Sequence, residues 1–400
     1  MAHAFTRLSV GRRASRRVGR AVGVVVTVGA TMLSPIIAAH TSLHAQGATT
    51  QKPKAAKVAK TPKGSGGDST SNPPKTRKLA APPLFTSDSV LAITLTTNVR
   101  TIKRDKRADA PWRAATVSYA TSDGKTATIP VRIKTRGIWR LNHCDYPPLR
   151  LKVANKDAKG TPFHDLDEPK LVSYCRDLDS YERYVLQEFQ LYRVYRQLTD
   201  VSHQVRLLRV TYVDSATKKV EATRYSFIIE DPKQVAARAG GEIMERKGAT
   251  AEDLDPRTSA IAYSFQYLIG NTDFSFSGLH NGQIVGLRNG VNLPVPYDFD
   301  FAGVIDAPHA GTDPSLPIRR VRDRLFRGFC GHEAAYASVF DLLRSKQNAI
   351  YGLYADSLGA LLAPGTVKST LSYYDGFYKA IATPKDAQRQ LFTDCLKVGG

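Results

Sequence analysis

Acidic residues are almost absent from the first fifth of this sequence. Residues 1–80 hold 14 Lys and Arg but a single acid, Asp68, whereas the whole chain of 400 residues has 57 basic and 36 acidic side chains. Most of the net charge of +21 therefore lies at the amino-terminal end. A basic protein suggests a nucleic-acid binder, but an excess confined to one end argues against that class. We expect no nucleic-acid partner.

A long apolar run is also missing. The stretch AVGVVVTVGATML at 21–33 is shorter than the roughly 20 residues that a membrane-spanning helix needs. It follows six arginines between Arg7 and Arg20 and precedes small residues up to Ala45, which is the order of parts in an export signal. We predict a signal peptide at residues 1–45 and a secreted, periplasmic or cell-envelope location. The alternative is an uncleaved anchor, which would be the chain's membrane contact.

Aromatic residues are absent from 46–82, and Val58 is the one branched aliphatic residue there before Leu79. Lys, Pro and Ser are frequent instead. Such a segment cannot bury enough apolar area to offset the entropy lost on ordering. We predict a disordered basic linker at residues 46–82.

Cysteine is scarce, and its four positions form no CxxC motif. Their wide separation disfavours a zinc site, and in an exported chain disulfides are the better interpretation. Among the possible pairings we favour Cys144 with Cys175 and Cys330 with Cys395, because each bond closes the shorter loop.

Alternating and β-branched segments begin after Leu84. They predict strands at 90–99, 112–121, 129–133, 149–153, 170–175, 205–213 and 222–230. Helical spacing predicts a long helix at 181–198, with Asp179 or Ser180 as its N-cap, and further helices at 258–269 and 338–362. A β-rich part at 83–230 therefore precedes an α-rich part at 231–400, without an internal repeat.

Two neighbouring strands share a basic face, and the long helix carries an acid in its apolar stripe. Arg132, Lys134 and Arg136 alternate with apolar residues, and Lys152 lies on the corresponding face of the next strand. Because an unpaired buried carboxylate costs several kcal/mol, we expect a cation from an adjacent strand beside Glu188. A partly exposed glutamate at the margin of the stripe is the alternative.

Oxygen-bearing side chains gather within 30 positions of the later sequence. These are Asn271, Asp273, His280, Asn281, Asp298 and Asp300. Carboxylates and an amide around two turns suit a hard cation such as Mg²⁺ or Mn²⁺. A hairpin turn at Asn289 and Gly290 would bring the second group of residues back beside the first. Solvated turn residues are the competing interpretation.

From about Leu84 to Cys330 the sequence resembles CotH-type proteins, a branch of the protein-kinase-like superfamily that is known from spore coats and secreted proteins. The matching features occur in the family's order: the RG turn at 136–137, PPLRL at 147–151, the long helix, FIIED at 227–231, GNTD at 270–273 and PYDFDF at 296–301. GNTD followed by YDF is also similar to HipA-type kinases. The resemblance implies an α+β, two-lobed protein-kinase-like fold, with a β-rich N-lobe that contains one long helix and an α-rich C-lobe.

The resemblance also implies roles for the two loops. Asp273 matches the base that accepts the proton of an acceptor hydroxyl, whereas Asn281 and Asp298 match metal ligands, with Asp300 as a further candidate ligand. Asp273 and Asn281 are eight positions apart, which is longer than in the kinase catalytic loop. Ser277 or His280 could therefore coordinate the metal instead, and an inactive member of the family stays an alternative.

For the nucleotide, the resemblance implies a lysine that binds phosphate oxygens and pairs with Glu188, and Lys170 is our choice. The predicted nucleotide contacts are Arg136, Gly137, Lys152 as the rival lysine, and Glu230. Trp139 and Arg140 could stack on a base, although packing of Trp139 against the protein is favoured.

Taken together, these features predict an exported kinase-like phosphotransferase. It would use Mg²⁺ or Mn²⁺ with ATP or another nucleotide and phosphorylate a hydroxyl-bearing acceptor, with a protein as the first candidate. One alternative is a catalytically inactive secreted pseudokinase or surface-assembly protein. A second is a metal-dependent hydrolase that uses Asp273, His280, Asp298 and Asp300.

Overall fold

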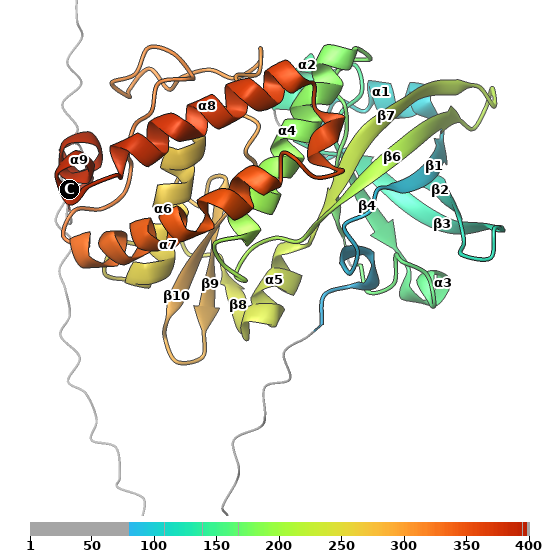
Figure 1. The fold of residues 1–400 in the computed structure, drawn as a ribbon. Coiled ribbons are helices and arrows are strands. Elements are labelled where there is room, and N and C mark those ends of the chain that lie inside the picture. The colour runs from blue at the N-terminus through green and yellow to red at the C-terminus, as the bar shows by residue number, and fades with distance from the viewer. Residues whose placement is uncertain (1–79, 108, 138, 167, 394, 398–400) are drawn as a thin grey trace, which may run out of the picture. The chain divides into compact units, whose positions relative to one another are not determined.

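The strands between residues 91 and 229 close into a seven-stranded barrel in the computed structural model (Figure 1). The structure describes residues 80–397 except 108, 138, 167 and 394, so the predicted signal peptide and nearly all of the predicted linker lie outside the described residues. The barrel strands are β1 (Leu91–Thr97), β2 (Arg113–Ala120), β3 (Thr126–Thr135), β4 (Leu149–Val153), β5 (Lys170–Val172), β6 (Val205–Asp214) and β7 (Val220–Ile229).

Alternate side chains of these strands fill the barrel, as the period of two in the sequence predicts. Leu95 in β1, Val117 in β2 and Ile133 in β3 are fully buried. Tyr212 of β6 is also buried and packs edge-on against Tyr146 at 4.7 Å between ring centroids. Aromatic and branched side chains of distant strands therefore share one core.

The prediction of a two-lobed protein-kinase-like α+β fold was wrong. Most strands lie close to their predicted positions, but β1 pairs antiparallel with β2 and parallel with β6, so the strands close into a barrel with no free edge. The parallel pairing runs from Leu91 opposite Leu208 to Thr97 opposite Asp214. The alternation of apolar and polar residues within each strand does not predict which distant strand it pairs with. The boundary predicted near residue 230 stays a prediction.

The long helix α4 (Asp179–Arg196) packs on the barrel as an amphipathic sequence should. Phe189 and Tyr192 both contact Phe227 of β7, with ring centroids 5.9 and 5.7 Å apart. The helix begins two residues earlier than expected: Leu178 is at the N-cap position, and Asp179 lies in the first turn. An acid in that turn is favourable beside the helix dipole.

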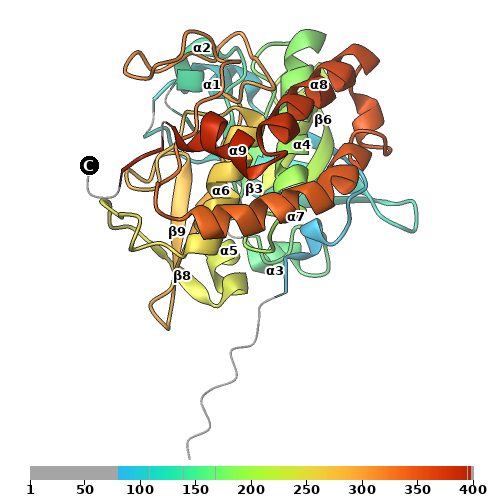
Figure 2. The same cartoon turned by 60° about the vertical axis from the view of Figure 1, so that its left-hand side comes forward.

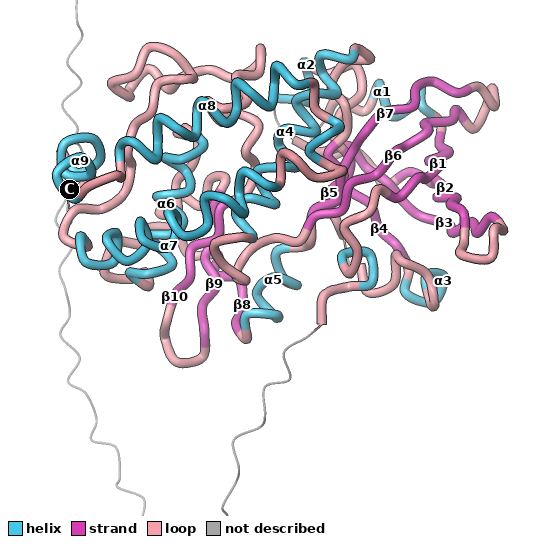
Figure 3. Tube along the Cα trace, in the orientation of Figure 1, coloured by secondary structure: helices cyan, strands magenta, loops and turns pink. Residues whose placement is uncertain are grey.

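Helices and a small sheet follow the barrel in the chain. The helices are α5 (Pro232–Ala239), α6 (Pro256–Ile269), α7 (Glu333–Gly352), α8 (Pro364–Ala380) and α9 (Pro384–Ala387). The sheet has the order β10-β9-β8 and contains β8 (Gly241–Met244), β9 (Gly282–Leu287) and β10 (Asn292–Pro296). α7 and α8 both pack on α6 (Figure 2). In Figure 3 these helices are cyan and the barrel strands are magenta.

The remaining short helices connect barrel strands. They are α1 (Val99–Arg104), α2 (Trp139–His143) and α3 (Asn155–Ala158). None of the described helices is long and apolar enough to cross a membrane.

Both predicted disulfides are confirmed. Cys144 is bonded to Cys175, and Cys330 is bonded to Cys395. The first bond joins the end of α2 to the segment between β5 and α4, and the second joins two segments near the carboxyl end. Disulfides are compatible with a secreted protein.

Candidate functional site

The hairpin of β9 and β10 brings the two oxygen-rich loops together, as predicted. Pro296 lies opposite Gly282 in the ladder, and the backbone N–H of Tyr297 donates to the carbonyl of Asn281 at 3.1 Å. The N–H of Asp298 donates to the hydroxyl of Tyr192 in α4 at 2.9 Å. Both loops are therefore anchored where α4 meets the barrel.

An arginine of α2 joins the acids of this region. Nη2 of Arg140 lies 2.5 Å from Oδ2 of Asp300 and 3.7 Å from Oε2 of Glu188. Nε2 of His309 is 3.1 Å from the same oxygen of Asp300. Although burial alone would raise the pKa of Asp300, the charge of Arg140 and the hydrogen bond with His309 hold that pKa below its usual range. Asp300 is therefore a carboxylate.

Glu188 is less well accommodated. It is 2% exposed, and its Oε1 has no hydrogen-bond partner within the described residues. Burial raises the pKa of Glu188 to about 8, against the opposing charge of Arg140. The predicted cation is present, but it comes from the short helix α2 and not from an adjacent strand.

Asp298 faces three cations. Burial raises the pKa of its carboxyl group, Asp300 raises it further, and the charges of Arg140, Arg136 and Lys170 oppose that rise. Among the residues that the structure describes, no side chain or backbone N–H donates a hydrogen bond to its carboxylate. Its oxygens are therefore available to another partner.

Two of these cations lie at ends of barrel strands. Lys170 begins β5, and burial together with the charge of Arg136 lowers its pKa to about 8. Its Nζ lies 4.3 Å from the centre of the Tyr297 ring. Arg136 follows β3 and precedes Gly137, which has a φ of 91° and allows the turn into α2. Nε of Arg136 is buried and lacks a hydrogen-bond partner in the described part of the chain.

Lys152 and Glu230 have other contacts. Nζ of Lys152 donates to Glu168 at 2.9 Å on the outer side of the barrel. Glu230 accepts two hydrogen bonds from Arg238, at 2.8 Å each, and one from the N–H of Gln204. Their described partners thus satisfy these charges, and the nucleotide contacts expected of both residues stay predictions.

Asp273 is held in a small closed loop. Its Oδ1 lies 2.9 Å from Nε2 of His280, and its Oδ2 accepts a hydrogen bond from the amide of Asn281 at 2.9 Å. The N–H of Asp273 donates to Asn271, and backbone bonds between Ser275 and His280 close the loop. The eight-position spacing thus forms a bulge that brings Asn281 back to Asp273.

A pocket of about 380 Å³ opens beside this loop. Its lining includes Asp273, His280, Phe301, Asp313 and Arg327. The guanidinium of Arg327 donates to the carbonyls of Thr272 and Phe274, which fixes the wall next to Asp273. A hydroxyl group could reach the Asp273 carboxylate from this pocket.

The described side chains do not form a metal site by themselves. Within the described residues, no three His, Cys, Asp or Glu side chains are grouped so that they could hold one. Mg²⁺ in phosphate-binding sites commonly takes one or two carboxylates together with phosphate oxygens of the substrate. Asp298, with unbonded oxygens, and Oδ1 of Asn281 fit an ion that arrives with its nucleotide. They do not form a cage for an ion alone.

Sequence reasoning missed two residues of this cluster. The sequence indicates only base stacking for Arg140, because nothing local to α2 shows that it meets Asp300 and Glu188. His309 gave no signal, because a single histidine in a loop has no periodicity that would assign it.

No family model matches this chain, and no curated protein matches it. The resemblance to CotH-type and HipA-type proteins therefore stays a prediction.

Proposed function

We propose that this chain is an exported phosphotransferase that moves a phosphoryl group from a metal-bound nucleotide to a hydroxyl acceptor, with ATP and a protein as the first candidates. The proposal is based on the chemistry of the site and not on a kinase-like fold. The observation that supports it most is that Arg136 and Lys170 face Asp298, whose carboxylate oxygens are unbonded within the described residues. Phosphoryl transfer mainly requires such positioned charges.

The cations provide the binding site for phosphate oxygens. Arg136 has a buried Nε without a partner in the described residues. The burial of Lys170 and the charge of Arg136 lower the pKa of Lys170. An anionic phosphate between Arg136 and Lys170 would relieve both costs, because opposite charges stabilise buried cations. Arg140 is paired with Asp300 and Glu188 and would form the side wall of this site.

Asp298 and Asn281 would hold the metal ion, which supplies positive charge against the phosphate oxygens when bound. On the other side, Asp273 would accept the proton of the acceptor hydroxyl while the hydroxyl oxygen bonds to phosphorus and the bond between phosphorus and the departing nucleoside diphosphate breaks. His280 and Asn281 fix the orientation of that carboxylate. The pocket that Asp273 and His280 line would admit the acceptor.

A catalytically inactive binding protein with the same site is the second candidate. One observation favours it: Arg140 already neutralises part of the charge of Asp300 and Glu188, which a metal ion would otherwise do. No observation in the described residues favours the hydrolase.

The test combines nucleotide binding with transfer. Mg²⁺ or Mn²⁺ with ATP should raise the melting temperature, because ligand at 100 times its dissociation constant adds about 2.7 kcal/mol to stability. Labelled ATP should then label the protein or an added acceptor. Asp298→Ala should lose both effects, whereas Asp273→Asn should bind nucleotide and lose transfer. Asp341→Asn, at an exposed ion pair of α7, is the control.

The outcomes separate the two candidates. Binding without transfer at any metal would support the inactive protein. Absence of a thermal shift at millimolar nucleotide would contradict both candidates.

A further inference from the structure

The helix that carries Arg140 is too short to hold its own shape. α2 spans five residues, from Trp139 to His143, and isolated helices of that length are unstable in water. Arg140 nevertheless reaches both Asp300 and Glu188. Contacts outside the helix must therefore hold it in place.

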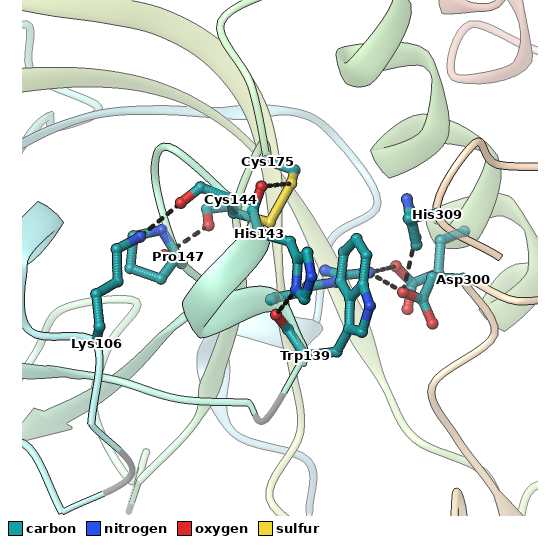
Figure 4. The surroundings of a disulfide bond; sticks show 11 residues. Lys106, Trp139, His143, Cys144, Pro147, Cys175, Asp300 and His309 are labelled. Carbon is teal, nitrogen blue, oxygen red and sulfur yellow. Dashed lines mark hydrogen bonds and ion pairs between the residues drawn. A yellow bond between two sulfur atoms is a disulfide. The ribbon is translucent and has the colours of Figure 1, made fainter. Parts of the chain in front are cut away.

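The Cys144–Cys175 disulfide provides such a contact directly after α2 (Figure 4). The N–H of Asp145 donates to the carbonyl of Cys175 at 2.9 Å, and Nζ of Lys106 donates to the carbonyl of Cys144 at 2.7 Å. The backbone N–H of Cys144 in turn donates to the carbonyl of Arg140 at 3.0 Å. The bond thus lies one helical turn from the arginine.

The partner cysteine connects the other two elements of the site. Cys175 lies between β5, which begins with Lys170, and α4, which carries Glu188. One covalent bond therefore links the chain segments that bear Arg140, Lys170 and Glu188.

Aromatic stacking holds the opposite end of α2. The ring of Trp139 stacks on His143, with centroids 4.0 Å apart and planes 7° apart, and it lies 5.4 Å from the ring of His309 (Figure 4). Because His309 also bonds to Asp300, the position of the Trp139 ring reports on how α2 sits against the acids. The stacked contact with His143 covers one face of this ring, and Trp139 stays 39% exposed.

We propose that the Cys144–Cys175 disulfide is a positioning element of the nucleotide site, which keeps Arg140 against Glu188 and Asp300 so that the site binds nucleotide well only in the oxidised protein. This inference rests on the proposed function. Without the bond, the five-residue helix would move away from the two acids, and the uncompensated negative charge of Asp300 would repel the phosphates. Cys330–Cys395 joins segments that carry none of these side chains and is the matched control.

The experiment uses the variant Cys330→Ser/Cys395→Ser, which keeps one disulfide, before and after treatment with dithiothreitol. In this step dithiothreitol loses two electrons and two protons and closes to its cyclic disulfide, while Cys144 and Cys175 become thiols. We expect the dissociation constant for Mg²⁺–ATP to rise at least about tenfold, because a change of this size corresponds to the loss of one charge-assisted contact. Cys144→Ser/Cys175→Ser should behave like the reduced protein.

A second comparison shows whether the effect acts through Arg140. Arg140→Gln should weaken nucleotide binding in the disulfide-bonded protein and add little once the bond is absent, because both changes remove the same contact. A dissociation constant that changes less than about twofold on reduction would overturn the proposal. The proposal would also be overturned if Arg140→Gln and loss of the disulfide each raised the dissociation constant by an independent factor. A bond with a merely structural role would give that result.

A nucleotide-free measurement separates this inference from the proposed function. Trp112 and Trp139 are the two tryptophans of the chain, so Trp112→Phe isolates the fluorescence of Trp139. Reduction should make Trp139 more accessible to acrylamide, because its stack with His143 and His309 loosens. Unchanged quenching would contradict the positioning role even if nucleotide does not bind, whereas increased quenching without nucleotide binding would contradict the proposed function alone.

Discussion

Glu188 and Glu230 are both buried glutamates beside an arginine, yet they are bonded very differently. Glu230 accepts two hydrogen bonds of 2.8 Å from Arg238 and one of 2.9 Å from the N–H of Gln204. Glu188 has Arg140 at 3.7 Å, and one of its oxygens lacks a hydrogen-bond partner among the described residues. Both oxygens of Glu230 thus have hydrogen-bond donors, whereas one oxygen of Glu188 has none among the described residues.

The difference separates stability from function. A completed buried ion pair is costly to break, because the remaining charge is left without a partner. An incompletely bonded buried carboxylate weakens the folded state in the absence of a ligand. Glu230 therefore contributes mainly to the fold, whereas Glu188 fits the proposed site, in which a ligand would complete the set of charges.

The largest effect is expected for Glu230→Ala. This substitution leaves Arg238, whose side chain is 15% exposed, without its carboxylate, which should lower the free energy of unfolding by about 3 kcal/mol. Urea unfolding measures the change. Glu221→Ala is the control, because its ion pair with Lys103 at 3.0 Å is partly exposed, and its loss should cost at most about 1 kcal/mol. Equal losses in both variants would contradict the distinction between them.

Glu188→Gln should give the opposite result. It replaces the carboxyl group that lies beside Arg140, so under the proposed function the rate of phosphoryl transfer should fall about 10²-fold. Its free energy of unfolding at pH 8 should stay the same or rise, because no partly ionised buried carboxyl remains. Transfer assays and urea unfolding on the same protein provide both values. A transfer rate equal to that of the unmodified protein would exclude Glu188 from the site.

The pH dependence of stability tests the same residue without an activity assay. Burial raises the pKa of Glu188 to about 8, from 4.5 for an ordinary glutamate. Between these values the folded protein binds more protons than the unfolded chain, so this residue makes the free energy of unfolding fall as pH rises from about 4.5 to 8. Below that range both states are protonated. Glu188→Gln should lose this part of the slope in unfolding measured at pH 5, 6.5 and 8, and an unchanged slope would assign the dependence to other groups.

The strands could be predicted from the sequence, but their closure could not. Alternation of apolar and polar residues indicated β2 and β6 to within a few residues. The parallel pairing of Leu91 with Leu208 depends on packing between distant segments. Local periodicity does not indicate which strands pair with each other. The positions of the individual strands were therefore nearly right, whereas the fold that the resemblance implied was wrong.

The same limit applies to the site. The turn at Asn289 and Gly290 sufficed to predict that Asp298 returns beside Asn281, because hairpin register is local. Arg140 meets Asp300, 160 positions away, only after α2 has docked. A buried acid such as Glu188 predicts that a cation exists but not which element supplies it.

The smallest effect concerns the two disulfides. The variant that loses more unfolding free energy should be the one that loses less nucleotide affinity. Cys330–Cys395 spans 65 positions and Cys144–Cys175 spans 31, so loss of the former frees the longer loop in the unfolded chain. Chain-entropy arguments then predict that Cys330→Ser/Cys395→Ser loses about 0.7 kcal/mol more unfolding free energy than Cys144→Ser/Cys175→Ser. Nucleotide binding should nevertheless weaken mainly in the second variant. If one variant lost more of both stability and affinity, the separation of a stabilising bond from a positioning bond would fail.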